Sequence, residues 1–140
     1  MTVVIETTSD LATCLDLRHR VFVLEQGVPV EEERDAHDEK AIHILARVDG
    51  AAAGTARILF DGDTAKVGRV CVLSDKRGQK LGVLLIEKAV EVARHKPGIT
   101  RVKLGAQVTA LGFYEKLGFV AEGAVFLDAG LEHRTMVRAL

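Results

Sequence analysis

One segment of the chain constrains the fold more than any other, residues 70–85, VCVLSDKRGQKLGVLL. An apolar run leads into a basic loop that carries Gly78 and Gly82, and an amphipathic helix follows directly. The first backbone N–H groups of a helix have no partner within it and lie at the positive end of its dipole, so they favour a phosphate or pyrophosphate. The segment therefore predicts an α/β chain with an anion site at a helix that begins near Gln79, although a glycine pair before a helix is also typical of a simple turn.

The composition indicates a single domain, residues 1–140, since 140 residues at 48% hydrophobic suffice for one core. The net charge is -1, so the chain has no overall positive electrostatic field to attract nucleic acid. Five phenylalanines, one tyrosine and no tryptophan leave few aromatic rings for stacking on bases. No apolar run approaches the roughly 18 residues of a membrane span. The start at Met1 lacks the basic region and cleavage site of a signal peptide. We therefore expect a cytoplasmic protein that binds neither nucleic acid nor a membrane, and a homodimer stays open.

Turn and capping residues divide the chain into alternating strands and helices. Ser9 or Asp10 can cap a helix that runs to about Leu24, and Asp-Gly pairs at 49–50 and 61–62 predict two hairpins. The other predicted elements are strands over about 2–6, 42–48, 53–61 and 65–73, a helix over about 79–96, a strand over about 100–106, a short helix ended by Gly118, and strands over about 119–127 and 131–139. This order predicts one mixed sheet.

A second motif, FYEKLGF at 113–119, follows the strand, loop and helix, and the pair resembles the GNAT superfamily of acyl-CoA N-acetyltransferases. The signature of that superfamily is Gln or Arg, two residues, Gly, one residue, then Gly or Ala. Arg77 and Gly82 match its ends, whereas Lys80 stands in place of its middle glycine. RHRVFVLEQGVP at 18–29 is similar to the small ElaA/YjcF-like group. The resemblance implies an α/β (α+β) fold with a mixed, largely antiparallel sheet of about six to seven strands and about four helices.

The resemblance also implies acetyl-CoA as co-substrate and assigns the residues that would bind it. The loop would hold the diphosphate through Arg77, Gly78, Gln79, Lys80, Leu81 and Gly82. The strand before the loop would offer backbone groups to the pantetheine amides and the acetyl carbonyl, from Val70, Cys71 and Val72. The Lys80 ammonium could compensate for the missing glycine by approaching the diphosphate.

Two residues are candidates for proton transfer. Tyr114, the single tyrosine, lies where the superfamily places a tyrosine near the departing CoA sulfur, and packing in a short helix is its alternative role. His133 shares a strand face with Leu131 and Thr135, which predicts that it faces a cleft or a covered side of the sheet. In relatives of glyphosate N-acetyltransferase a histidine in the final strand acts as the base, and His133 matches that position. A histidine that is merely hydrogen-bonded is equally compatible with the pattern.

Further polar residues have weaker assignments. Arg69 borders the acetyl position and could meet a substrate carboxylate, or lie on the surface. Gln107 is a candidate substrate contact, and it stands with Val23 where the glyphosate enzymes carry arginine, so a strongly anionic acceptor is not supported. We expect the acidic stretch at 31–39 to be a solvated loop, or a rim that attracts a cationic amine. No metal-site spacing is present, and Cys14 and Cys71 are predicted to be small buried hydrophobes.

The function predicted from these residues is transfer of an acetyl group from acetyl-CoA to the primary amine of a small molecule by direct attack. Two alternatives stay open. An acyl-homoserine-lactone synthase has an N-terminal pattern similar to RHRVFV followed by acidic residues, but such enzymes are longer and FYEKLGF argues against one. A non-catalytic acyl-CoA-binding module would keep the loop without the chemistry.

Overall fold

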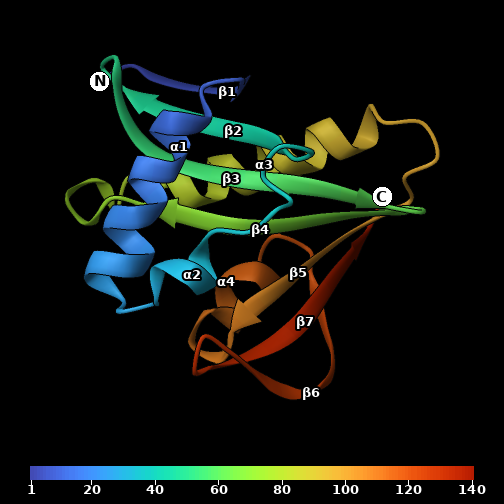
Figure 1. Cartoon of the computed structure of the whole chain (residues 1–140). Coiled ribbons are helices and arrows are strands. Elements are labelled where there is room, and N and C mark those ends of the chain that lie inside the picture. Colours follow the sequence, from blue (N-terminus) through green and yellow to red (C-terminus); the bar gives the residue numbers. More distant parts are fainter.

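The computed structural model describes every residue from Met1 to Leu140 and gathers all the strands into one seven-stranded sheet (Figure 1). The strands lie in the order β1-β2-β3-β4-β5-β7-β6. Their bounds are β1 Val3–Thr8, β2 Ile42–Val48, β3 Ala51–Asp61, β4 Thr64–Val72, β5 Arg101–Gln107, β6 Val120–Asp128 and β7 Leu131–Ala139. All neighbours are antiparallel except β4 and β5, so the sheet is mixed and largely antiparallel, as predicted.

The first of the two predicted hairpin turns lies at its predicted Asp-Gly pair, and the second is displaced by one residue. Asp49 and Gly50 connect β2 and β3 with φ of 50° and 83°, the conformation that favours Gly and Asn or Asp in a two-residue turn. The second turn lies one residue later than predicted, because Asp61 still pairs with Thr64 and the turn residues are Gly62 and Asp63. Both short turns keep β2, β3 and β4 adjacent.

The helices agree with the predicted order, but the first is irregular. Asp10 caps α1 (Leu11–Arg18) by accepting from the Thr13 N–H at 3.1 Å. The chain then continues as a π-helix, η1 (His19–Glu25), where a regular helix to about Leu24 was predicted. The remaining helical segments are α2 (Val30–Glu33), η2 (Ser74–Lys76), α3 (Leu81–Arg94), η3 (Val108–Ala110) and α4 (Leu111–Glu115). The short α2 was not predicted. None of the helices is both long and apolar enough to cross a membrane.

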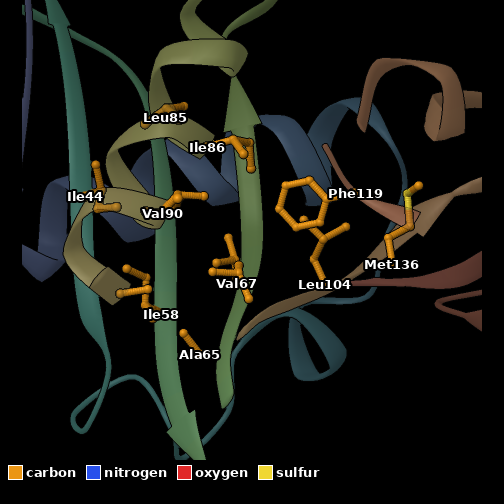
Figure 2. Packing of buried hydrophobic residues seen from close by; sticks show 14 of the residues in the cluster. Ile44, Ile58, Ala65, Val67, Leu85, Ile86, Val90, Leu104, Phe119 and Met136 are labelled. Carbon is orange, nitrogen blue, oxygen red and sulfur yellow. The ribbon is translucent and has the colours of Figure 1, made fainter. Parts of the chain in front are cut away.

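Helix α3 supplies one side of the main core, while α1 covers the opposite face of the sheet (Figure 1). Leu85, Ile86 and Val90 of α3 pack over the strands, and Figure 2 shows them beside Val67 and Ile58. The helix is amphipathic, as predicted, with Leu84 39% exposed and Leu85, Ile86 and Val90 buried. The same cluster continues to Leu104, Phe119 and Met136, so a single core joins both parts of the sheet.

The sheet opens between β4 and β5. These parallel strands pair only over Thr64–Lys66 with Arg101–Lys103, whereas β5 pairs with β7 along its full length. Beyond Lys66 the two strands diverge, as Figure 1 shows. Their facing edges are therefore unpaired with each other, and unpaired strand edges offer backbone donors and acceptors to a ligand.

Candidate active site

Two pockets flank the divergence of β4 and β5. The first has a volume of about 390 Å³ and is lined by β4 and β5, by the α1–α2 region and by the β6–β7 turn. The second has a volume of about 590 Å³ and is lined by the end of β4, the loop before α3 and the start of α3. Gln26, Val70 and Ala110 line both pockets, so a long ligand can pass from one into the other.

The second pocket contains a row of unsatisfied backbone donors. None of the backbone N–H groups from Arg77 to Val83 donates a hydrogen bond within the protein. Helix α3 begins at Leu81, two residues later than predicted, and has no side-chain cap. Uncapped N–H groups at a helix N-terminus attract anions. This loop is therefore suited to a diphosphate, as the sequence predicts.

Lys80 adopts the backbone conformation that explains the glycine of the superfamily signature. Its φ of 63° and ψ of 21° lie in the left-handed region, at the N-cap of α3. A residue with a Cβ pays about 1 to 2 kcal/mol there, and glycine does not. Lys80 thus keeps the local geometry at some cost in stability, and its side chain stays exposed beside the pocket.

The Arg77 side chain holds the loop in place. Its guanidinium contacts both carboxylate oxygens of Glu25, at 2.6 and 2.8 Å, and its Nε donates to the Val72 carbonyl at 3.0 Å. The hydrogen bonds from Arg77 lower the pKa of Glu25. Because these partners occupy the side chain, Arg77 offers the second pocket its backbone N–H and a fixed loop rather than a free cation.

The end of β4 is bulged where it borders both pockets. The β3–β4 register shifts between Thr55 and Arg57, and Arg69 opposite this shift has a φ of 52°. Bulges of this kind redirect a strand and interrupt its pairing, often beside active sites. Val70 lies in the bulge and Cys71 and Val72 follow it, and these three predicted pantetheine contacts all line the second pocket.

Cys71 is a buried hydrophobe rather than a nucleophile. Desolvation raises the pKa of its thiol to about 12, so the sulfur stays protonated at neutral pH. It packs in a small cluster with Cys14 and Leu17, and both cysteines are free. These surroundings confirm the prediction made for both.

Tyr114 lines the first pocket. Its ring packs edge-on against Phe113 and Phe119, with centroids 4.9 and 6.0 Å away. No protein group bonds its hydroxyl. Desolvation raises the pKa of the phenol, so it keeps its proton and can act as a donor.

His133 enters the same pocket from β7. It is 9% exposed, and its Nδ1 lies 2.7 Å from the Leu131 carbonyl. A carbonyl oxygen can only accept, so Nδ1 carries the proton of this hydrogen bond. The neutral ring then has an unprotonated Nε2. The structure thus brings Tyr114 and His133, predicted from separate motifs, to one pocket.

The two predicted substrate contacts also line the first pocket. Gln107 pairs with His133 across β5 and β7. The Arg69 guanidinium donates from Nε to the Glu33 carbonyl at 3.0 Å and from Nη2 to Asp35 at 3.3 Å. Its Nη1 has no partner in the protein. Arg69 therefore has one free nitrogen for a ligand and is otherwise bound to the segment after α2.

Part of the acidic stretch is a buried ionic network rather than a solvated loop. Arg18, 1% exposed, contacts the Glu33 carboxylate and donates to Asp38 at 2.7 Å. Arg57 donates to the same Asp38 at 2.9 Å and to Asp35 at 2.8 Å. Buried charges need such pairing. The sequence analysis missed this network, although Arg18 at an apolar helix position was a signal.

His43 is a structural residue of the same region, as its position in the strand suggests. Its side chain is 6% exposed, and its Nε2 lies 2.8 Å from the Asp38 carbonyl. The bond fastens the segment after α2 to strand β2.

Phe22 and Gln26 are among the pocket residues that were found only in the structure. Phe22 and Gln26 reach the first pocket from η1 and the turn that follows it. A π-helix has a wider turn than an α-helix and is frequent at functional sites. No local sequence pattern predicts a π-helix, so the positions of Phe22 and Gln26 could not be predicted.

Known proteins resemble the chain along its whole length. Residues 6–140 match the family model described as acetyltransferase (GNAT) domain. YjcF of Bacillus subtilis, an uncharacterised N-acetyltransferase, is 34% identical over 137 residues, which cover 97% of each chain. The crystal structure of Escherichia coli ElaA has a TM-score of 0.86 at 32% identity, covering 98% of this chain and 99% of that one. An acyl-CoA N-acyltransferase from Pseudomonas aeruginosa has a TM-score of 0.85 at 34% identity over 99% of each chain.

Proposed function

Because this chain belongs to the GNAT acetyltransferase family, we propose that it is an acetyl-CoA-dependent N-acetyltransferase acting on the primary amine of a small molecule. One observation carries the proposal. The pocket with free N–H groups joins the pocket of Tyr114 and His133 at Val70 and Ala110. A diphosphate bound at the loop would therefore extend its acyl end toward the two proton-transferring side chains.

In this proposal, different parts of the joined pockets bind different parts of the two substrates. The N–H groups from Arg77 to Val83 bind the diphosphate, and the unpaired edge of β4 binds the pantetheine amides and polarises the acetyl carbonyl. Acetyl-CoA supplies the acetyl thioester. The acceptor amine enters the first pocket, where polar side chains such as Arg69 and Gln107 lie beside apolar ones such as Phe22 and Leu104. Arg69 and Gln107 orient this acceptor.

The proton transfers follow from the two protonation states. His133 Nε2 accepts the proton that the amine loses as its nitrogen bonds the acetyl carbon. The carbon–sulfur bond breaks, and the Tyr114 hydroxyl donates a hydrogen bond to the departing thiolate. A phenol with a pKa of about 10 facing a thiol near 8.5 makes full transfer uphill by about 2 kcal/mol. Burial raises the pKa of Tyr114 further, so hydrogen bonding to the thiolate is its main contribution.

The direct test is an acetyl-CoA turnover screen measured by thiol release. The acceptor panel holds amino acids, amino sugars, polyamines and aminophosphonates. We expect turnover with at least one acceptor, and about 100-fold less at neutral pH for His133→Ala. The variant should partly recover at high pH, where the free amine is already deprotonated. Binding of CoA without turnover of any acceptor would instead favour the non-catalytic module.

A further inference from the structure

Phe126 of β6 packs on the ring of His133. The two ring centroids are 5.8 Å apart and the ring planes differ by 27°, which is a stacked arrangement. His133 lines the first pocket, whereas Phe126 does not. Phe126 therefore supports the imidazole without meeting a ligand in the pocket.

A bulge in β6 creates this contact. Glu122 pairs with Thr135, but the next pair is Phe126 with His133, so three β6 residues lie opposite Arg134 alone. In a regular antiparallel ladder Ala124 would lie opposite His133. The bulge replaces that methyl group with an aromatic ring.

Two contacts fix the bulge and the ring. The Arg134 guanidinium donates from Nε and Nη2 to the Gly123 carbonyl at 3.1 and 2.9 Å, and Gly123 has a φ of 74°. A Cβ on Gly105 of β5 would lie 3.3 Å from Phe126 Cζ. The absence of a side chain at Gly105 thus leaves room for the Phe126 ring beside His133.

We propose that Phe126 is a positioning residue for His133. The Nδ1–H bond to Leu131 defines one edge of the imidazole, but a single hydrogen bond leaves the ring free to tilt. The Phe126 stack fixes the ring plane, and together the two contacts keep the proton on Nδ1 and the Nε2 lone pair toward the acceptor. The inference rests on the proposed function, because fixing the His133 ring affects catalysis only if His133 accepts the proton of the amine.

The experiment compares Phe126→Ala with Phe126→Tyr, which keeps an aromatic ring. Because Phe126 is 39% exposed, its truncation should not unfold the protein, and Phe126→Leu serves as a second variant if it does. Leu127→Ala is the matched control, since Leu127 lies on the same strand, is 70% exposed and pairs with Glu132 rather than with His133. The readouts are kcat, the KM for acetyl-CoA, and the tautomer of ¹⁵N-labelled His133 in the neutral ring, assigned by His133→Gln.

We expect Phe126→Ala to lower kcat roughly 10-fold, less than loss of the base itself, with little change in the KM for acetyl-CoA. Its His133 spectrum should show both tautomers, whereas the wild type, Phe126→Tyr and Leu127→Ala show the Nδ1–H form. A folded Phe126→Ala variant with a single Nδ1–H tautomer and unchanged kcat would overturn the inference. Full activity of His133→Gln would contradict the base role in the proposed function, a separate result that the tautomer readout does not depend on.

Discussion

At the scale of single residues, the candidate site combines a phenol that donates with an imidazole whose Nδ1–H is already bonded. Burial keeps the proton on the Tyr114 phenol, and the Leu131 carbonyl directs the His133 proton to Nδ1. Neither state depends on a charged partner, because no hydrogen bond joins either side chain to an ionised group. One donor and one acceptor thus face the same pocket.

We expect Tyr114→Phe to lower turnover 10- to 100-fold, around or below the usual effect of losing one acid-base group. The hydroxyl has no partner in the protein, and the edge-on contacts with Phe113 and Phe119 involve the ring that phenylalanine retains. The melting temperature should therefore change little. Turnover by thiol release and thermal unfolding measure the two effects.

Phe119→Leu is the contrasting variant, because Phe119 is 2% exposed in the core. It should lose about 1 to 3 kcal/mol of stability from imperfect packing while leaving the hydroxyl in place. Equal losses of stability and turnover in Tyr114→Phe would mean that Tyr114 is a packing residue.

Single positions were predictable where a local rule determined them. The alternation of β7 put His133 on the face opposite the core residue Met136, and the motif around Tyr114 put it in a short helix. The partner of His133 was not predictable, because the bulge in β6 displaces the ladder by two residues. Arg69 and Arg77 illustrate the same limit, since their ionic partners Asp35 and Glu25 are distant in sequence.

At the scale of elements, the loop at 77–80 and the first turn of α3 form one unit. A ligand can reach the free N–H groups of this unit only if it comes close to the backbone. Gly82 lies in this turn, and a Cβ there would be 3.4 Å from Phe113 Cζ. A longer side chain would enter the second pocket or displace Phe113, which lines it. The glycine therefore keeps the N–H groups accessible.

We predict that Gly82→Leu weakens CoA binding at least 10-fold in calorimetry while the protein stays folded. Glu87→Leu is the matched control, since it adds a leucine to an exposed position of the same helix outside the pocket. It should bind CoA like the wild type. Unchanged CoA affinity in folded Gly82→Leu would place the diphosphate elsewhere.

The segment after α2 gives the protein a defined response to acid. The hydrogen bonds from Arg57 lower the pKa of Asp35 from 3.8 to about 2. Between these values the unfolded state binds more protons than the folded state, so this contribution is present above about pH 4 and is lost as the pH falls toward 2.

At pH 6 the free energy of unfolding of Asp35→Asn, measured by urea denaturation, should therefore be lower than that of the wild type. The expected loss is about 1 to 2 kcal/mol, because a charged hydrogen bond is removed. The difference should shrink between pH 4 and pH 2, the interval between the ordinary and the lowered pKa of Asp35. Glu31→Gln, at an exposed carboxylate without a partner, should follow the wild type throughout. A difference that is constant with pH would rule out the Asp35 titration as its source.

Elements with strong local signals were predictable, and irregular ones were not. The Asp49-Gly50 turn, the Asp10 cap and the termination of α3 before Pro97 agree with the structure. The π-helix η1 and the one-turn α2 carry no pattern of their own. Tertiary contacts determine them, because Glu25 binds Arg77 and Glu33 binds Arg18.

At the scale of the whole molecule, the sheet is two half-sheets that stay together without a complete ladder. Only Thr64–Lys66 and Arg101–Lys103 connect β4 to β5. The core cluster under α3 continues across this junction to Phe119 and Met136, so packing compensates for the missing strand pairs (Figure 2). The opening is a permanent part of the fold, and a ligand that bridges it need not separate paired strands.

CoA should therefore change amide exchange locally rather than reorganise the sheet. The N–H groups from Arg77 to Val83 have no partner, so they should exchange rapidly in the free protein, and only a ligand can protect them. The edge of β4 from Val70 to Val72 should gain protection with them, because β5 leaves it unpaired. Hydrogen exchange measured with and without CoA tests both segments.

The same binding should stabilise the folded state by about 2.7 kcal/mol when free CoA exceeds its Kd 100-fold. Gly82→Leu with a 10-fold higher Kd should gain only about 1.4 kcal/mol at the same CoA concentration, and less if its binding is weaker still. Its residues 77–83 should be correspondingly less protected, whereas Glu87→Leu should match the wild type in both. Protection that appeared at 77–83 but not at 70–72 would mean that the ligand binds the loop without bridging into the opening between β4 and β5. In that case the acyl end would not reach Tyr114 and His133, and the proposed transfer would lose its geometric basis.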